Sequence, residues 1–206
     1  MMDVKIFDSI HIKPPVEAIY KRLGFRRNTT RISPAETKKF NQDIHEALGY
    51  INLKGAALRV AIENKNSGTT FLATGDVFKS NLVAALLKHA SEVLLIAATS
   101  GRTIINSIEK IQNKDTTKAV IFDAVASEMT DACLEWIIGR IKINLCRENK
   151  QLTSKRVSCG YGDFALTYQL RIYQLLKLKQ LNIDITDSCM LIPEKSVTAL
   201  TGIIKK

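Results

Sequence analysis

The first fifty residues carry apolar positions at helical spacing. Residues 14–23 and 34–48 predict two helices, and the second begins with Pro34 directly after Ser33, a favourable N-cap residue. The apolar stripe of the second helix repeats at i, i+4 and i+8. It consists of Phe40, Ile44 and Leu48. We expect this N-terminal helical segment, residues 1–52, to serve packing or dimerisation rather than chemistry.

Period-two and continuous apolar patterns follow. Residues 57–64 alternate as a half-buried strand, and 69–74 predict a second strand. The short apolar run 93–98 is typical of a strand buried on both faces. Residues 183–187 and 196–204 alternate again, which predicts a C-terminal hairpin or paired strands.

Helical segments separate these strands. Ser80 begins a helix that we expect to reach about residue 90, and 103–111 form a second one after a turn. Residues 115–145 predict one long helix and 164–178 a later one, while 150–155 have the composition of a polar linker. The one glycine before 103–111 is weak support for a nucleotide-binding turn, which needs a richer glycine pattern.

Composition limits the function classes. The 206 residues suit one large domain or two small ones, and the formal charge is +10. The basic excess lies in residues 13–39 and 140–179, spread along helices without interleaved aromatic residues. We therefore expect a solvated basic surface, open to an acidic partner or anionic ligand, and no nucleic-acid partner.

The cysteines are four and far apart, with no C-x-x-C pair. This spacing predicts neither a metal site nor a disulfide framework, and it favours a reduced, cytoplasmic protein. The beginning of the chain lacks a signal-peptide pattern. The longest apolar run, 93–98, is too short to cross a bilayer, so no membrane association is expected.

Three acids recur on one side of the predicted long helix, at Glu128, Asp131 and Glu135. One interpretation is a solvated acidic ridge. The other is that one of these carboxylates faces a cationic ligand. Spacing alone favours the solvated ridge.

Residues 156–163, with the sequence Arg-Val-Ser-Cys-Gly-Tyr-Gly-Asp, combine residue types that a simple turn does not require. Arg156 offers a planar fork of donors suited to a carboxylate. Glycines allow positive φ or close approach of a ligand to the backbone. The segment therefore predicts a binding loop.

This loop resembles the Arg-x-x-Pro-Gly-Tyr motif in the activation domain of cobalamin-dependent methionine synthase. Residues 182–190 are similar to that family's Gly-x-x-Leu-Thr-Glu-Ser-x-x-Met segment, and 193–198 resemble its Pro-x-x-Ser-Val-Ser/Thr. Residues 98–101 and 122–128 look like a stand-alone version of the domain. The resemblance spans most of residues 55–204 and implies an α+β fold over residues 53–206, with a mixed, largely antiparallel twisted sheet and packed helices.

The resemblance also implies a function. In that family the domain binds S-adenosylmethionine and supports reductive methylation of inactive cob(II)alamin, with an electron from a flavodoxin-type donor. Arg156 is expected to hold the ligand's carboxylate and Glu128 its cationic part. Backbone around Ser158, Cys159 and Gly160 is expected to meet the adenosyl part, and Tyr161 to lie by the reactive methyl group.

The chain departs from the family at Cys159, where the fused domain has proline, and two family contacts have no counterpart in this sequence. The cobalamin is expected to be carried by a partner, a methionine synthase lacking its own activation domain. The protein is then an accessory component and not a self-contained enzyme. Alternatives are a non-catalytic adaptor that docks on a corrinoid-binding protein, and an unrelated enzyme that uses the Cys159 thiol.

Overall fold

The computed structural model describes residues 3–26 and 29–206, so residues 1–2 and 27–28 of the predicted N-terminal segment lie outside the described residues. A seven-stranded sheet forms the centre, with the order β4-β3-β2-β5-β9-β6, and β1 pairs with β2 beside this path. Strands β7 and β8 form a separate two-stranded sheet. Every strand pair among the described residues is antiparallel.

The strands and helices alternate irregularly along the chain. The strands are β1 (Lys5–Phe7), β2 (Lys54–Asn66), β3 (Thr69–Leu72), β4 (Val77–Lys79), β5 (Glu92–Thr99), β6 (Lys150–Leu152), β7 (Asp184–Ile185), β8 (Leu191–Ile192) and β9 (Ser196–Lys205). The α-helices are α1 (Val16–Arg22), α2 (Pro34–Leu48), α3 (Asn81–Leu86), α4 (Arg102–Ile111), α5 (Thr116–Arg147) and α6 (Tyr168–Leu175), followed by the 3-10 helix η1 (Leu178–Leu181). This organisation confirms the predicted α+β fold.

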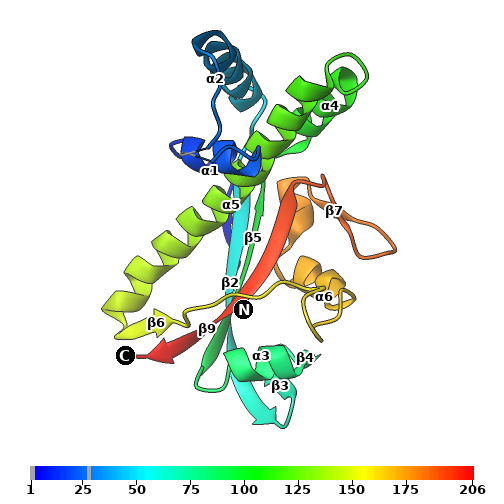
Figure 1. Ribbon diagram of the computed structural model, residues 1–206. Coiled ribbons are helices and arrows are strands. Elements are labelled where there is room, and N and C mark those ends of the chain that lie inside the picture. The colour runs from blue at the N-terminus through cyan, green and yellow to red at the C-terminus, as the bar shows by residue number, and fades with distance from the viewer. Residues whose placement is uncertain (1–2, 27–28) are drawn as a thin grey trace.

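Helices cover both faces of the sheet (Figure 1). Helices α1, α2, α4 and α5 share one hydrophobic core, in which α5 runs diagonally across the strands. Helices α3, α6 and η1 share the second core on the opposite face. Strand β5 is buried along almost its whole length because both faces and both edges are covered, which explains its continuous apolar run.

At Gly55 of β2, the side chain of Ile137 from α5 packs directly against the sheet. A Cβ atom at this position would lie 2.3 Å from Ile137 Cδ1 and 2.6 Å from the carbonyl oxygen of Ala97. Real Cβ atoms do not approach other atoms this closely, so only glycine allows the helix to pack at this depth. The crossing fixes the height of α5 over β2 and β5.

The two N-terminal helices are confirmed. Ser33 caps α2 through a capping box: its hydroxyl accepts from the N–H of Glu36, whose carboxylate accepts from the N–H of Ser33. Ile44 is buried and the rest of the predicted stripe packs against the same core as α5. The segment also contains β1, which pairs with β2. The boundary between residues 1–52 and 53–206 stays a prediction.

Several details of the predicted elements were wrong. The helix expected to reach about residue 90 ends at Leu86. Residues 150–155 are not only a linker, because 150–152 form β6 on the sheet edge. The alternating segments 183–187 and 196–204 do not pair with each other: β7 pairs with β8, whereas β9 pairs with β5 and β6. The helix predicted over 164–178 is shortened to α6, because a one-residue left-handed step at Lys177 ends it.

Candidate functional site

The predicted binding loop leaves the sheet edge after β6, crosses over β9 and leads to α6 (Figure 1). Val157 exchanges hydrogen bonds of 2.8 and 3.0 Å with Leu200 of β9, which fixes the start of the loop to the sheet. Gly160 has a φ of +89° and donates its N–H to the carbonyl oxygen of Phe164 at 2.7 Å. Residues 157–164 therefore form a tight, internally bonded turn.

Asp163 ties the other end of the loop to the beginning of α3. Its Oδ1 accepts from the Ser80 hydroxyl at 2.6 Å and from the N–H of Leu82 at 3.1 Å, and its Oδ2 accepts from the N–H of Asn81 at 2.6 Å. These donors, the Ser80 hydroxyl first, lower the pKa of the Asp163 carboxyl. The sequence marks Asp163 only as a turn residue, because its partners are about eighty residues away.

The side chains of Tyr161 and Cys159 have opposite environments. Tyr161 is 68% exposed, so its ring is available to a ligand or partner. Cys159 is only 7% exposed and lies in the core shared by α3 and α6. Only the backbone of Cys159 is thus placed to meet a ligand.

Burial raises the pKa of the Cys159 thiol to about 12. A reactive thiol needs a lowered pKa and access to solvent. The thiol-enzyme alternative therefore has no support in the structure.

The backbone of the turn leaves room on one side. A Cβ atom placed on Gly160 would meet only Leu166 Cδ1, at 3.7 Å. The carbonyl oxygen of Ser158 accepts from the N–H of Tyr161 at 3.3 Å. The predicted contacts of Ser158, Cys159 and Gly160 with an adenosyl group stay predictions, and the open face at Gly160 is compatible with them.

Arg156 points to α5 on the other side of the sheet edge and forms an ion pair with Glu135 through its Nη1. About a third of the Arg156 side chain is exposed, against 60% of Glu135. The donor fork predicted to hold a ligand carboxylate thus already holds a carboxylate of the protein.

Glu128 is also paired, but with a residue that the sequence did not indicate. Arg22, in the last turn of α1, donates from Nε to Glu128 Oε1 at 2.5 Å and lies 3.7 Å from Asp131. Glu128 is 17% exposed, the most covered acid of the three. No local sequence pattern predicts that Arg22 pairs with Glu128, because the pair depends on how α1 packs on α5.

The structure therefore does not pair Glu128 with the loop. Seven residues of helix separate Glu128 from Glu135, which places the two carboxylates on the same face of α5 and about 10 Å apart along its axis. Asp131 and Glu135 are more than half exposed, as expected for a solvated ridge, and two arginines from different segments pair with Glu128 and Glu135.

Two pockets among the described residues lie away from the loop. One of about 750 Å³ is a shallow depression over the outer face of α2. The other, of about 230 Å³, lies between residues 9–14, the end of α2 and Met129 of α5. Neither is lined by Arg156, Tyr161 or Glu128, so neither coincides with the predicted site.

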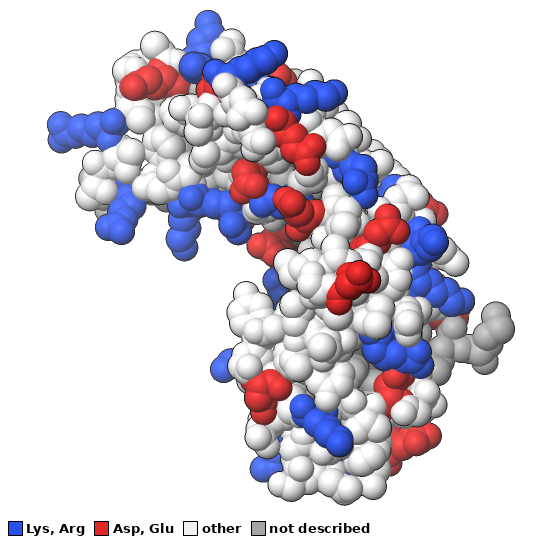
Figure 2. Space-filling view, turned by 90° about the vertical axis from the view of Figure 1, so that its right-hand side faces the viewer, with Lys and Arg blue, Asp and Glu red and all other residues white. Residues whose placement is uncertain are grey.

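Charge is unevenly distributed on the surface. Figure 2 shows lysine and arginine side chains gathered on the upper end of the molecule, which projects over a hollow on the left of the view. Figure 1 places α1, α2 and α4 at this end. Both basic and acidic side chains border this hollow in Figure 2, so its rim has mixed charge.

No group of three or more His, Cys, Asp or Glu side chains in residues 3–26 and 29–206 is arranged to hold a metal ion. Among the same residues, no helix has both the length and the apolar character needed to span a bilayer.

Among the comparisons with known proteins, only the comparison with solved structures gives a match. No family model and no curated protein matches the sequence. Among solved structures, the chain is similar to "Crystal Structure of the MetH Reactivation Domain bound to AdoHcy" with a TM-score of 0.69 and 15% sequence identity. The match covers 98% of this chain and 78% of that chain. The protein therefore has the fold of the MetH reactivation domain, from the N-terminal helices to the final strand.

Proposed function

We propose that the protein is an S-adenosylmethionine-binding reactivation subunit. It supports reductive methylation of cob(II)alamin in a cobalamin-dependent methionine synthase that lacks its own activation domain. The observation that carries this proposal is the loop 156–163, anchored at both ends and presenting Arg156 and Tyr161 on a fold shared with a domain that binds AdoHcy.

Arg156 is the proposed carboxylate anchor. The Val157–Leu200 bridge fixes the backbone next to Arg156 at the sheet edge, and the planar guanidinium fork can match a carboxylate with two parallel hydrogen bonds. Arg156 Nη1 is paired with Glu135, so the ligand carboxylate would displace Glu135 or share the guanidinium with it.

The remaining contacts position the ligand. The open face at Gly160 is where the backbone is proposed to meet the adenosyl part, with Ser158 and Cys159 contributing backbone only. The exposed ring of Tyr161 is proposed to lie by the methyl group. Glu128 is proposed to offset the positive charge of the ligand.

S-adenosylmethionine supplies an electrophilic methyl group, so the transfer needs no acid, base or nucleophile from this chain. What the protein contributes is orientation of the ligand toward a corrinoid held by another subunit. The proposed partners are a cobalamin-binding synthase and a flavodoxin-type reductant. The proposed location is the cytoplasm.

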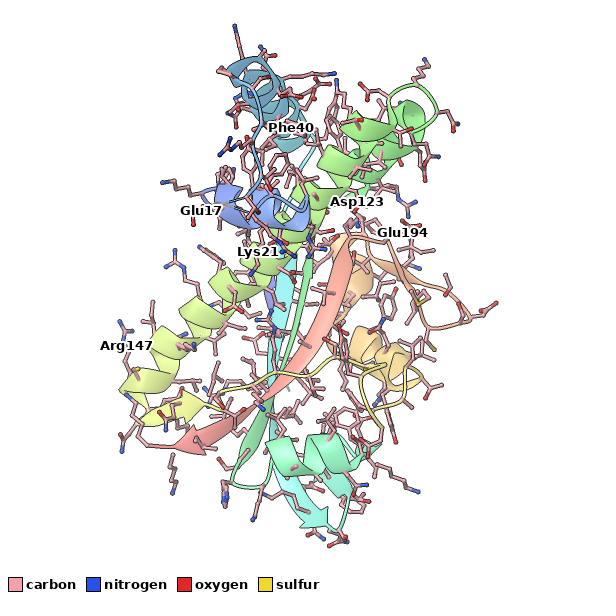
Figure 3. The ribbon with its side chains drawn as sticks, viewed as in Figure 1. Glu17, Lys21, Phe40, Asp123, Arg147 and Glu194 are labelled. Carbon is pink, nitrogen blue, oxygen red and sulfur yellow. The ribbon has the colours of Figure 1, made fainter. Side chains whose placement is uncertain are left out.

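Calorimetric titration with S-adenosylmethionine tests the proposal. Arg156→Ala should weaken binding by about 1.5–3 kcal/mol, as expected for a hydrogen bond to a charged group, and Arg156→Lys should recover only part of it because lysine lacks the fork. Arg147→Ala, at the far end of α5, removes the same charge and should leave affinity unchanged (Figure 3). Equal binding by the wild-type and Arg156→Ala proteins would refute the role of Arg156.

A non-catalytic adaptor is the second candidate. Two observations favour it: Arg156 and Glu128 are both engaged by partners within the chain, and the two pockets lie elsewhere. An adaptor should bind a purified cobalamin-carrying domain in a pull-down without S-adenosylmethionine and show no heat of ligand binding. Docking that depends on the ligand would instead favour the reactivation subunit.

A further inference from the structure

The four cysteines lie in three regions of the fold. Cys133 is buried in the core shared by α1, α2, α4 and α5, whereas Cys146 is exposed near the end of α5. Cys159 is buried in the core on the opposite face of the sheet. Cys189 is half-buried in the turn between β7 and β8, two residues before Leu191 of that second core. Cys159 and Cys189 are therefore the two cysteines that border the same core.

The binding loop carries Cys159 along the side of β9 that faces this core. Val157 and Leu200 form an antiparallel bridge, and both pack in the second core. Side chains two positions apart on extended backbone point to the same face. Cys159 follows Val157 by two positions, and the buried Thr198 precedes Leu200 by two. The antiparallel register that starts at the bridge thus brings Cys159 toward Thr198.

Gln169 of α6 connects Thr198 to Cys189. Its Oε1 accepts from the Thr198 hydroxyl at 2.8 Å, and its Nε2 donates to the carbonyl oxygen of Cys189 at 3.1 Å. Burial raises the pKa of the Cys159 thiol most, and negative charge at Cys189 raises it further. A like charge has this effect only at short range, so the two sulfur atoms lie near each other.

We propose that Cys159 and Cys189 are a redox-sensitive pair whose oxidation to a disulfide fastens the binding loop to the turn between β7 and β8. The oxidant is a peroxide. The Cys189 sulfur attacks one oxygen of hydrogen peroxide, which breaks the O–O bond, releases water and leaves a sulfenic acid. The Cys159 sulfur then attacks the sulfenic sulfur and releases a second water. Each water takes up one thiol proton.

The exposure of the two thiols fits this order of steps. Cys159 is 7% exposed and its pKa is about 12, so a peroxide in solution does not reach it as a thiolate. Cys189 is the more accessible of the two, and a sulfenic acid formed there makes the second step intramolecular. Disulfides in a reducing compartment are usually transient and redox-sensing, which is the behaviour expected of this pair.

The disulfide would act on the backbone of the loop. Cys159 lies inside the tight turn at residues 157–164, and the carbonyl of Cys189 is held by Gln169. A covalent bond between them closes the segment 159–189, which includes α6, and restricts its unfolded conformations. The proposal goes beyond the proposed function and does not require it, because the bond forms without S-adenosylmethionine.

Peptide mapping without reductant, after hydrogen peroxide is added to the full chain, tests the pair. The wild type should give linked peptides that contain Cys159 and Cys189 and that dithiothreitol separates. Cys159→Ala and Cys189→Ser should each abolish the link. Cys146→Ser, which removes an exposed cysteine outside the pair, should leave it unchanged. Sulfinic acid at Cys189 without a link, or a link through Cys133 or Cys146 instead, would overturn the proposal.

Hydrogen exchange and thermal unfolding measure the effect on the loop. Oxidation should slow exchange of the amides of residues 158–164 and raise the melting temperature in the wild type and in Cys146→Ser, and dithiothreitol should reverse both changes. Neither change should occur in Cys189→Ser. A disulfide that leaves loop exchange unchanged would overturn the fastening. Calorimetry with S-adenosylmethionine on the reduced protein tests the proposed function separately, so the failure of one proposal is distinguishable from the failure of the other.

Discussion

Ser80 and Asp163 meet at the beginning of helix α3, where the Ser80 hydroxyl donates to Asp163 Oδ1 at 2.6 Å while Ser80 Oγ accepts from the N–H of Val83 at 3.1 Å. The serine and the aspartate together satisfy three of the free N–H groups of the helix. Asp163 therefore joins the loop to the first turn of α3 through hydrogen bonds, in addition to the core that Cys159 and Val83 share.

Asp163→Ala should lower the melting temperature and increase hydrogen exchange in both the loop and α3, because it removes three acceptor contacts at once. Thermal unfolding followed by circular dichroism, with exchange measured by mass spectrometry, checks this. The exposed Asp187→Ala is the control. A change confined to α3 would show that the loop does not depend on the cap.

Acid should weaken the ion network in which Arg59 and Lys150 both pair with Glu92 and Glu148. Hydrogen bonds from Arg59, then from Lys150, lower the pKa of Glu148 to about 2. Because this folded-state pKa lies below the unfolded value of about 4.3, the contribution of Glu148 to stability is complete above that pH and lost as the pH falls toward 2.

Urea unfolding of the wild type and of Glu148→Gln at several pH values measures this contribution. The difference in the free energy of unfolding should be largest near neutral pH, decrease below about pH 4.3 and vanish near pH 2. It should be small throughout, since Glu148 is exposed and salt screens the pair. A difference that grows in acid contradicts the assignment.

Cys159 should resist alkylation. Its thiol is buried and its pKa is raised to about 12, so little thiolate is present at neutral pH. Peptide mapping after brief treatment with iodoacetamide should find the exposed Cys146 labelled well before Cys159. Preferential labelling of Cys159 would revive the thiol-enzyme alternative.

Gly55→Ala should destabilise the protein by about 1–3 kcal/mol, the usual cost of overpacking a core. The new methyl group would collide with Ile137 and with the backbone of β5. Gly139→Ala is a matched control on the exposed side of α5, where a Cβ atom meets nothing within 4 Å. There alanine should stabilise by about 0.5–1 kcal/mol through helix propensity. Denaturant unfolding measures both.

The local patterns in the sequence were sufficient for most elements. The capping box at Ser33 and the long apolar stripe of α5 depend on neighbours three or four residues away, and both were predictable. Strand β6 was missed because three residues with two polar side chains form a strand only by pairing with β9.

The site was predictable only in part. Residues 156–163 are contiguous, so their role as one loop could be inferred from composition. Their ion pairs could not, because Arg22, Glu128, Glu135 and Arg156 come from three separate elements. The spacing of the acids on α5 indicated a shared face, but not which cations would meet it.

The position of β9 has a consequence for synthesis on the ribosome. Strand β9 pairs with β5, with β6 and with Val157 at the start of the loop, and all three precede it in the chain. Until residues 196–205 have emerged, one edge of the apolar strand β5 is unpaired. Val157 likewise has no strand with which to form its hydrogen bonds. About a hundred residues separate β5 from β9, so this closure is a slow, late event. We therefore expect β5, the most apolar strand, to be the part of the nascent chain that needs protection from aggregation for the longest time.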